Sequence, residues 1–131
     1  MGAELYRGSC ACGKVRFEVS LELEQGTFKC NCTMCTKARF WGMAVQAETF
    51  KVVAGADDLT TYTGKNVSHH FCKHCGIKLF GKVFVQQPPM VSISIATLDG
   101  VDPMELCKAP LQYMDGLHDR WDREPAFTGH L

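Results

Sequence analysis

Apolar and polar residues alternate along several segments of this chain, which is the pattern of β-strands with one buried face. Every second residue is apolar between positions 15 and 19, and the same alternation returns between positions 91 and 95. Further β-branched or aromatic runs of strand length cover residues 40–45, 50–53, 59–63 and 79–85. The pattern therefore predicts a mainly β protein.

Residues that favour turns separate these runs, as expected for antiparallel strands joined by short connections. They occur at Gly26 and at residues 54–58, 64–66, 88–89 and 99–100. Only residues 102–108 are expected to form a short helix, with Pro103 in its first turn. Residues 113–131 look irregular, and we expect Trp121 and Phe127 to pack this tail back onto the sheets.

The length and charge of the chain limit what it can be. A chain of 131 residues is the usual size of one domain, so we expect a single domain over residues 1–131. Its 14 basic and 14 acidic residues give a formal net charge of zero, whereas proteins that bind nucleic acids or anionic membranes usually carry a basic excess. No apolar run reaches transmembrane length, and the first residues lack the apolar stretch that directs secretion. We therefore expect a cytoplasmic protein that binds neither nucleic acid nor membranes.

The chain contains eight cysteines, which in a cytoplasmic protein are more often metal ligands or catalytic thiols than disulfides. Four of them form two close pairs, each followed directly by a glycine: Cys10 and Cys12, and Cys72 and Cys75. A tight turn lets the two sulfurs of a pair point at one ion, and two such pairs make the tetrahedral four-thiolate site that zinc favours. We expect these residues to hold a closed, structural zinc. The alternative is four buried thiols without metal.

A second group supplies three sulfurs within a short segment: Cys30, Cys32 and Cys35. Three protein ligands leave one tetrahedral position of a zinc ion open, which distinguishes a catalytic zinc from a structural one. An open zinc can hold a thiol as the thiolate or lower the pKa of a bound water. Two alternatives stay open. The group could recruit Cys107 or a histidine and close into a second structural site, or it could stay without metal and act through redox thiols.

Other residues carry weaker signals. Four are expected to wall a site around the three cysteines: Asn31, Thr33, Phe40 and Trp41. Alternation should turn His69 and His70 to opposite sides of a strand, so that one of them lines a pocket, while His74 is expected to be exposed. We expect Cys107 to be a buried thiol and three methionines to belong to the core: Met90, Met104 and Met114. A polar run in the tail is expected to be solvated: Asp115, His118, Asp119, Asp122 and Arg123.

The order of the cysteine motifs resembles a known family. Gly8-Ser9-Cys10-x-Cys12-Gly13-x-Val15-x-Phe17 is followed by Cys30-x-Cys32-x-x-Cys35 and then by Phe71-Cys72-x-x-Cys75-Gly76. Over residues 6–98 this order resembles the family of the glutathione-dependent formaldehyde-activating enzyme and centromere protein V, with seven cysteines in register. That family often has a histidine between the first two cysteines of the middle motif, where this chain has Asn31.

The resemblance implies antiparallel sheets in a β-tent arrangement, similar to the Mss4-like fold, with zinc-knuckle turns. It also implies Zn²⁺ at both groups. The structural ligands of the family match Cys10, Cys12, Cys72 and Cys75, and its catalytic ligands match Cys30, Cys32 and Cys35. The named enzyme joins glutathione to formaldehyde to give S-(hydroxymethyl)glutathione, formally as a carbon–sulfur lyase.

The leading hypothesis is a zinc-dependent enzyme of the carbon–sulfur lyase type that acts on a small thiol adduct or aldehyde, with a link to glutathione. Its expected partner is therefore a small-molecule thiol or aldehyde. A non-catalytic, zinc-stabilised binding module is the main alternative, in which the three-cysteine group only shapes a surface. A thiol redox protein is a third reading, and it requires a reversible disulfide among Cys30, Cys32 and Cys35.

Overall fold

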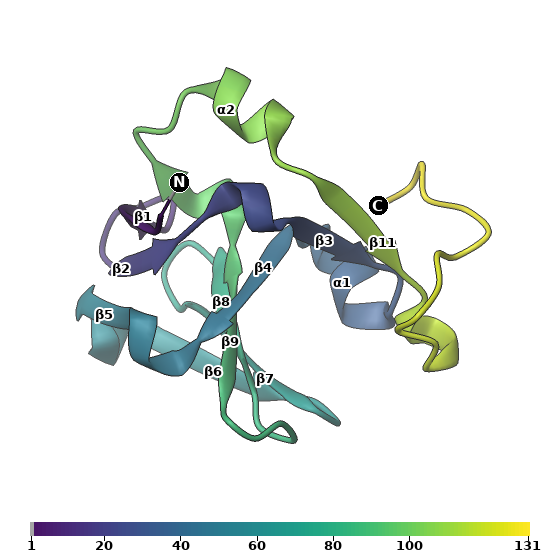
Figure 1. The fold of residues 1–131 in the computed structure, drawn as a ribbon. Coiled ribbons are helices and arrows are strands. Elements are labelled where there is room, and N and C mark those ends of the chain that lie inside the picture. The colour runs from purple at the N-terminus through teal and green to yellow at the C-terminus, as the bar shows by residue number, and fades with distance from the viewer. Residues whose placement is uncertain (1) are drawn as a thin grey trace.

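The computed structural model describes residues 2–131 and arranges their strands in two sheets (Figure 1). The smaller sheet has four strands in the order β10-β1-β2-β5, and every neighbouring pair is antiparallel. Its members are β1 (Glu4–Ser9), β2 (Arg16–Leu21), β5 (Phe50–Ala54) and β10 (Leu98–Asp99). The mainly β prediction is therefore confirmed, and β2 and β5 lie where the hydrophobic pattern placed strands.

The larger sheet has seven strands in the order β11-β3-β4-β9-β8-β7-β6. Its members are β3 (Thr27–Cys30), β4 (Gly42–Gln46), β6 (Leu59–Thr63), β7 (Val67–Cys72), β8 (Lys78–Val83), β9 (Met90–Ser94) and β11 (Leu111–Met114). The pair of β3 and β11 runs parallel, side by side, while the other pairs are antiparallel (Figure 1). The expected antiparallel sheets are confirmed except at this edge, where the chain reaches β11 only after the long crossover that parallel strands need.

Within residues 2–131 the helical segments are short. They are α1 (Thr33–Ala38), α2 (Pro103–Lys108) and the 3₁₀ turns η1 (Leu23–Gln25), η2 (Ala47–Thr49), η3 (Ala56–Asp58), η4 (Ile95–Thr97) and η5 (Gly116–His118). Helix α2 confirms the helix predicted at 102–108, and the Asp102 carboxylate accepts a hydrogen bond from the backbone N–H of Met104 at its start. Helix α1 was not predicted, because it buries no residue and so carries no apolar stripe. Across the described chain, no helix is long and apolar enough to span a membrane.

The hydrophobic core joins the two sheets through aromatic side chains. Phe17 of β2 lies against Phe50 of β5, with ring centroids 5.3 Å apart, and Phe50 meets Phe80 of β8 at 4.6 Å. Burying a side chain of this size stabilises a fold by about 1.5–3 kcal/mol. The apolar positions of the segments 15–19 and 91–95 all belong to this core, as their alternation predicted.

Several side chains that were expected in the core lie at the surface. Phe127 is 79% exposed and Trp121 is 48% exposed, so these two rings do not fasten the tail to the sheets. Met104 is 64% exposed, and Cys107, which was expected to be buried, is exposed as well. Both lie on α2, which has no fully buried residue because it lies along the rim of the fold (Figure 1).

Candidate metal centres

Four cysteine sulfurs from two distant parts of the chain meet at one point. Cys10 and Cys12 lie in the connection between β1 and β2, whereas Cys72 and Cys75 lie at the turn from β7 to β8. All four Sγ atoms lie within 4.8 Å of one another, with 3.6 Å between Cys10 and Cys12 and 3.7 Å between Cys12 and Cys72. Four sulfurs bound tetrahedrally to zinc at about 2.3 Å stand about 3.8 Å apart. This four-cysteine cluster therefore has the geometry to hold one zinc ion.

A tight turn that ends in glycine builds each half of the four-cysteine cluster, over four residues in one half and five in the other. The N–H of Gly13 bonds to the carbonyl of Cys10 at 3.1 Å, and the N–H of Gly76 bonds to the carbonyl of Cys72 at 2.8 Å. Both glycines have a φ of 78°, a left-handed conformation that glycine adopts without steric penalty. The glycine after each pair is thus what allows the two sulfurs of that pair to face the same point.

Backbone N–H groups also point at the sulfurs of this cluster. Val15 donates to the Sγ of Cys10, and His74 donates to the Sγ of Cys72, each over 3.4 Å. Hydrogen bonds of this kind favour the thiolate form that a metal ion requires. The side chain of His74 is exposed, as predicted, and its Nε2 lies 2.7 Å from the Asp58 carboxylate, so it is engaged outside the cluster.

Cys30, Cys32 and Cys35 form a second group, the three-cysteine cluster, with Sγ atoms that also lie within 4.8 Å of one another. Cys30 ends β3, Cys32 is the N-cap of α1, and Cys35 lies in the first turn of that helix. The N–H of Cys32 bonds to the Sγ of Cys30 and the N–H of Cys35 bonds to the Sγ of Cys32, both over 3.4 Å. Hydrogen bonds from Cys30 and Cys35 lower the pKa of Cys32 and favour its thiolate.

The three-cysteine cluster has no fourth member of its own. Among residues 2–131, no further cysteine, histidine or carboxylate joins its sulfurs at the same mutual distance. Cys107, the candidate for closing the site, is exposed on α2 and does not belong to the group. An ion held here would therefore keep one tetrahedral position free of such protein ligands.

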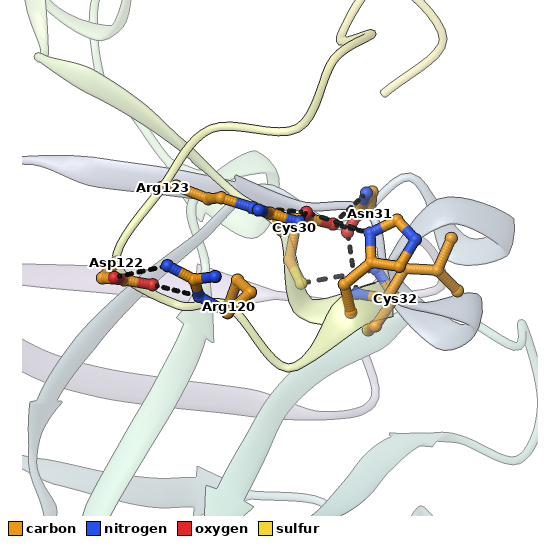
Figure 2. Close-up of polar contacts among 9 residues, drawn as sticks. Cys30, Asn31, Cys32, Arg120, Asp122 and Arg123 are labelled. Atoms are coloured by element: carbon orange, nitrogen blue, oxygen red, sulfur yellow. Dashed lines mark hydrogen bonds and ion pairs between the residues drawn. The ribbon is translucent and has the colours of Figure 1, made fainter.

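Asn31, between the first two cysteines of this cluster, is bound by the C-terminal tail. Its Nδ2 donates to the Asp115 carboxylate at 2.9 Å, and its Oδ1 accepts from the N–H of Leu117 at 2.9 Å (Figure 2). Its own N–H bonds to the carbonyl of Met114 at 3.2 Å. Because β11 runs parallel to β3, Met114 pairs with Cys30, and this register brings the tail to the cluster.

Asp115 is the centre of the polar contacts that hold the tail. It is only 2% exposed, and its carboxylate also accepts hydrogen bonds from the Nε of Arg123 at 3.0 Å and from the Nδ1 of His118 at 2.9 Å. The hydrogen bond from Asn31, followed by those from Arg123 and His118, lowers the pKa of Asp115 to about 2. Ionised Asp115 therefore ties three parts of the chain together at neutral pH.

The polar run of the tail was expected to be solvated. That expectation is wrong for Asp115, which is buried, and right for the residues that follow it. Asp119 and Asp122 are exposed, and Asp122 forms an ion pair with Arg120 at 3.1 Å (Figure 2). Asp115 differs because it follows β11 directly, where the sheet already fixes the backbone beside Cys30.

Turn η5 lies directly against the three-cysteine cluster. A Cβ placed at Gly116 would be 2.5 Å from the Sγ of Cys30 and 2.6 Å from the ring of Trp121, both closer than real contacts allow. Only glycine therefore fits between the sulfur and the indole ring. Trp121 packs on the backbone of this turn even though nearly half of its surface is exposed.

Phe40, Lys78 and His69 form another group beside this cluster. The N–H of Phe40 bonds to the carbonyl of Cys35 at 3.1 Å, so the ring follows α1 directly. The Nζ of Lys78 lies 3.9 Å from the centre of that ring and 2.8 Å from the Nδ1 of His69. Burial, with a further contribution from the charge of Lys78, lowers the pKa of His69 to about 4. His69 is therefore neutral at pH 7, and its Nδ1 accepts the hydrogen bond from Lys78.

Of the four residues that were expected to wall the site, two lie beside the three-cysteine cluster and two do not. Asn31 and Phe40 lie beside the three-cysteine cluster through the contacts just given. Thr33 is exposed at the start of α1. The indole N–H of Trp41 donates to the Oγ1 of Thr27 at 2.8 Å, and the ring packs on the core, so Trp41 is a structural residue.

The two adjacent histidines occupy opposite faces of β7, as alternation predicted. His69 meets Lys78, whereas His70 stacks on Phe80 with ring centroids 4.7 Å apart. Lys78 itself was missed, because a single lysine at the start of an apolar strand has no motif. Its only signal in the sequence is a charge at a position next to two core residues.

Two comparisons with known proteins agree with this arrangement. A family model described as the glutathione-dependent formaldehyde-activating enzyme matches residues 5–112, a range that includes both cysteine clusters. A protein of Rhodobacter sphaeroides, known from a crystal structure, is 29% identical, and the match covers 81% of this chain and 99% of that chain with a TM-score of 0.70. Because the family model takes in most of its length, the chain belongs to the family of the glutathione-dependent formaldehyde-activating enzyme.

Proposed function

We propose that this chain is a zinc-dependent enzyme of the carbon–sulfur lyase type that acts on a small thiol adduct or aldehyde, with glutathione as the first thiol to test. The observation that carries the proposal is the unequal size of the two cysteine clusters, four mutually close sulfurs in one and three in the other. Membership of the formaldehyde-activating family supports the same chemistry.

The donor atoms of both clusters suit zinc. Thiolate sulfur is a preferred zinc ligand, and the sulfur spacings of the four-cysteine cluster are close to those of a tetrahedral site. We assign a structural zinc to the four-cysteine cluster and a catalytic zinc to the three-cysteine cluster. When bound at the latter, zinc supplies an open coordination position that favours the deprotonated form of a thiol or water.

Residues around the three-cysteine cluster favour the thiolate form of its sulfurs and hold the cluster against the tail. The N–H groups of Cys32 and Cys35 stabilise charge on the neighbouring sulfurs. Asn31 anchors the tail, and Gly116 covers the sulfur of Cys30 from that side. These contacts hold the cluster in place, and Cys30 is only 2% exposed.

The proposed reaction is the addition of a thiol to an aldehyde, and its reverse. The thiol sulfur forms a bond to the carbonyl carbon, the carbonyl electron pair moves to oxygen, and the proton of the thiol ends on that oxygen. With glutathione and formaldehyde the product is S-(hydroxymethyl)glutathione. Because the thiolate is the nucleophile, a site that favours the thiolate raises the fraction of the substrate thiol that can react at neutral pH.

Matched cysteine variants test the assignment of a structural zinc to one cluster and a catalytic zinc to the other. The wild type and Cys107→Ser, which alters a cysteine outside both clusters, are expected to hold two zinc ions per chain. Cys32→Ser should hold one zinc, stay folded and lose the acceleration of S-(hydroxymethyl)glutathione formation over the spontaneous rate. Cys72→Ser should fail to fold, because a structural zinc contributes on the order of 10 kcal/mol, as much as the stability of a whole domain.

The rival functions give different results in the same experiments. A binding module would hold one zinc tightly, keep three free thiols at the three-cysteine cluster and accelerate no reaction between thiols and aldehydes. A redox protein would lose two mass units reversibly on mild oxidation, through a disulfide within the three-cysteine cluster. Loss of the same metal and the same stability in Cys32→Ser and Cys72→Ser would contradict the proposed assignment.

A further inference from the structure

Lys78 is a lysine whose ammonium is turned toward the interior. It is the first residue of β8, three residues after Cys75, and it precedes the fully buried Leu79. Lys82, four residues along the same strand and beyond the β-bulge, is exposed. The Nζ of Lys78 instead lies 2.8 Å from the Nδ1 of His69, a side chain that is only 7% exposed.

Contacts to two rings fix this ammonium beside the three-cysteine cluster. Besides its bond to His69, the Nζ of Lys78 lies 3.9 Å from the centre of the Phe40 ring, a favourable position for a cation. Phe40 is tied to the cluster because its N–H bonds to the carbonyl of Cys35. Burial lowers the pKa of Lys78, and negative charge on the three-cysteine cluster opposes that effect, so the ammonium and a thiolate of the cluster stabilise each other.

We propose that Lys78 is a positioning residue of the three-cysteine cluster, whose fixed ammonium favours an anionic ligand at the open position of a bound zinc. The inference rests on the proposed function. Three thiolates and a divalent ion carry a net negative charge, and an anionic fourth ligand increases it. Gathering negative charge in a partly buried site is unfavourable unless a cation lies nearby.

The position of Lys78 follows from the rest of the fold. The turn that holds Cys72 and Cys75 leads directly into β8, so the four-cysteine cluster sets the start of the strand that carries Lys78. His69 lies on the neighbouring strand β7, and its Nδ1 accepts a hydrogen bond from the ammonium, which has only donors. The four-cysteine cluster therefore helps to set the place of the charged side chain that lies beside the three-cysteine cluster.

A comparison of charged and neutral ligands tests this role. The chain is loaded with Co²⁺ in place of zinc, and its visible absorption is followed while azide, an anion, or imidazole, a neutral ligand, is added. Lys78→Met, which keeps most of the stem, should weaken azide binding on the order of tenfold to a hundredfold and change imidazole binding by less than about threefold. Lys78→Arg should retain most of the azide affinity, and the matched control Lys82→Met should behave as the wild type.

Two results would overturn the inference while the proposed function stands. One is equal azide affinity in Lys78→Met and the wild type; the other is equal weakening of azide and imidazole, which is what a purely structural role predicts. If Lys78→Met does not fold, Lys78→Gln, which can still bond to His69, takes its place with the same expectations. A wild type that binds a single Co²⁺, or two with no response to either ligand, would instead contradict the proposed function itself.

Discussion

Replacing Gly116 by alanine tests whether the tail is part of the three-cysteine cluster. The added Cβ would lie 2.5 Å from the Sγ of Cys30 and 2.6 Å from the Trp121 ring. Gly116 does not have a positive φ, so alanine adds volume there without backbone strain. Trp121 is half exposed and can move, whereas a metal-bound sulfur of Cys30 cannot move without leaving its ion.

The size of the effect follows from the cost of overpacking. Forcing an extra methyl group into a filled site typically costs about 1–3 kcal/mol. If the strain is relieved when the three-cysteine cluster gives up its metal, the affinity for that metal falls by the same free energy. The expected loss is about 5- to 150-fold. The four-cysteine cluster contains neither contact and should keep its affinity.

A competition titration with a zinc chelator measures both affinities in one experiment. The matched control is Gly129→Ala, because a Cβ at Gly129 meets nothing within 4 Å and the residue lies in the same tail. We expect Gly116→Ala to lose its weaker zinc at a lower chelator concentration than Gly129→Ala, and both variants to lose the tighter zinc together. Equal release curves for the weaker zinc in the two variants would refute the packing of the tail on Cys30.

Three further changes test other parts of the account. Asn31→Ala removes two hydrogen bonds to the tail and leaves their partners unpaired. It should therefore lower the free energy of unfolding by about 1–3 kcal/mol in a denaturant titration and speed proteolysis of the tail. Unchanged proteolysis would count against the anchoring role of Asn31. Because the pKa of Asp115 is about 2 in the folded chain and near 3.9 when unfolded, its bonds stabilise the fold above about pH 4 and are lost as the pH falls toward 2. The difference in unfolding free energy between the wild type and Asp115→Asn should shrink over that range, and a constant difference would contradict the assignment. Leu79→Ala should cost about 2–5 kcal/mol because Leu79 is fully buried, whereas the exposed Leu5→Ala should change the free energy of unfolding by less than about 0.5 kcal/mol.

The strands that the sequence predicted are those in which one face is buried and the other is not. Alternation is clear in β2 and β9, because each buries every second side chain in the core. β1 was missed, since three of its six residues are exposed and it contains Gly8, where a side chain would clash with Phe17. The parallel place of β11 could not be predicted either, because it depends on where a distant strand ends.

Both cysteine clusters were predictable because their members come in closely spaced pairs or triplets, in which a local turn brings the sulfurs together. The tail was not, because Asp115 and Gly116 reach Cys30 through the register of β11 on β3, which no local pattern reveals. Lys78 was missed for a related reason: its partners, His69 and Phe40, come from two other segments. Spacing along the chain thus predicts candidate metal ligands, whereas the groups that tune a site come from tertiary contacts.

The most direct test of the central claim is X-ray absorption spectroscopy at the zinc edge, with the metal content measured on the same reduced sample. Seven cysteine sulfurs shared by two ions predict an average of about 3.5 sulfurs per zinc at about 2.3 Å, and one oxygen or nitrogen neighbour for every two ions. Added glutathione should replace that lighter neighbour and raise the average toward four sulfurs. One zinc per chain with four sulfurs, unaffected by glutathione, would contradict the claim that the smaller cluster holds an ion with an open position.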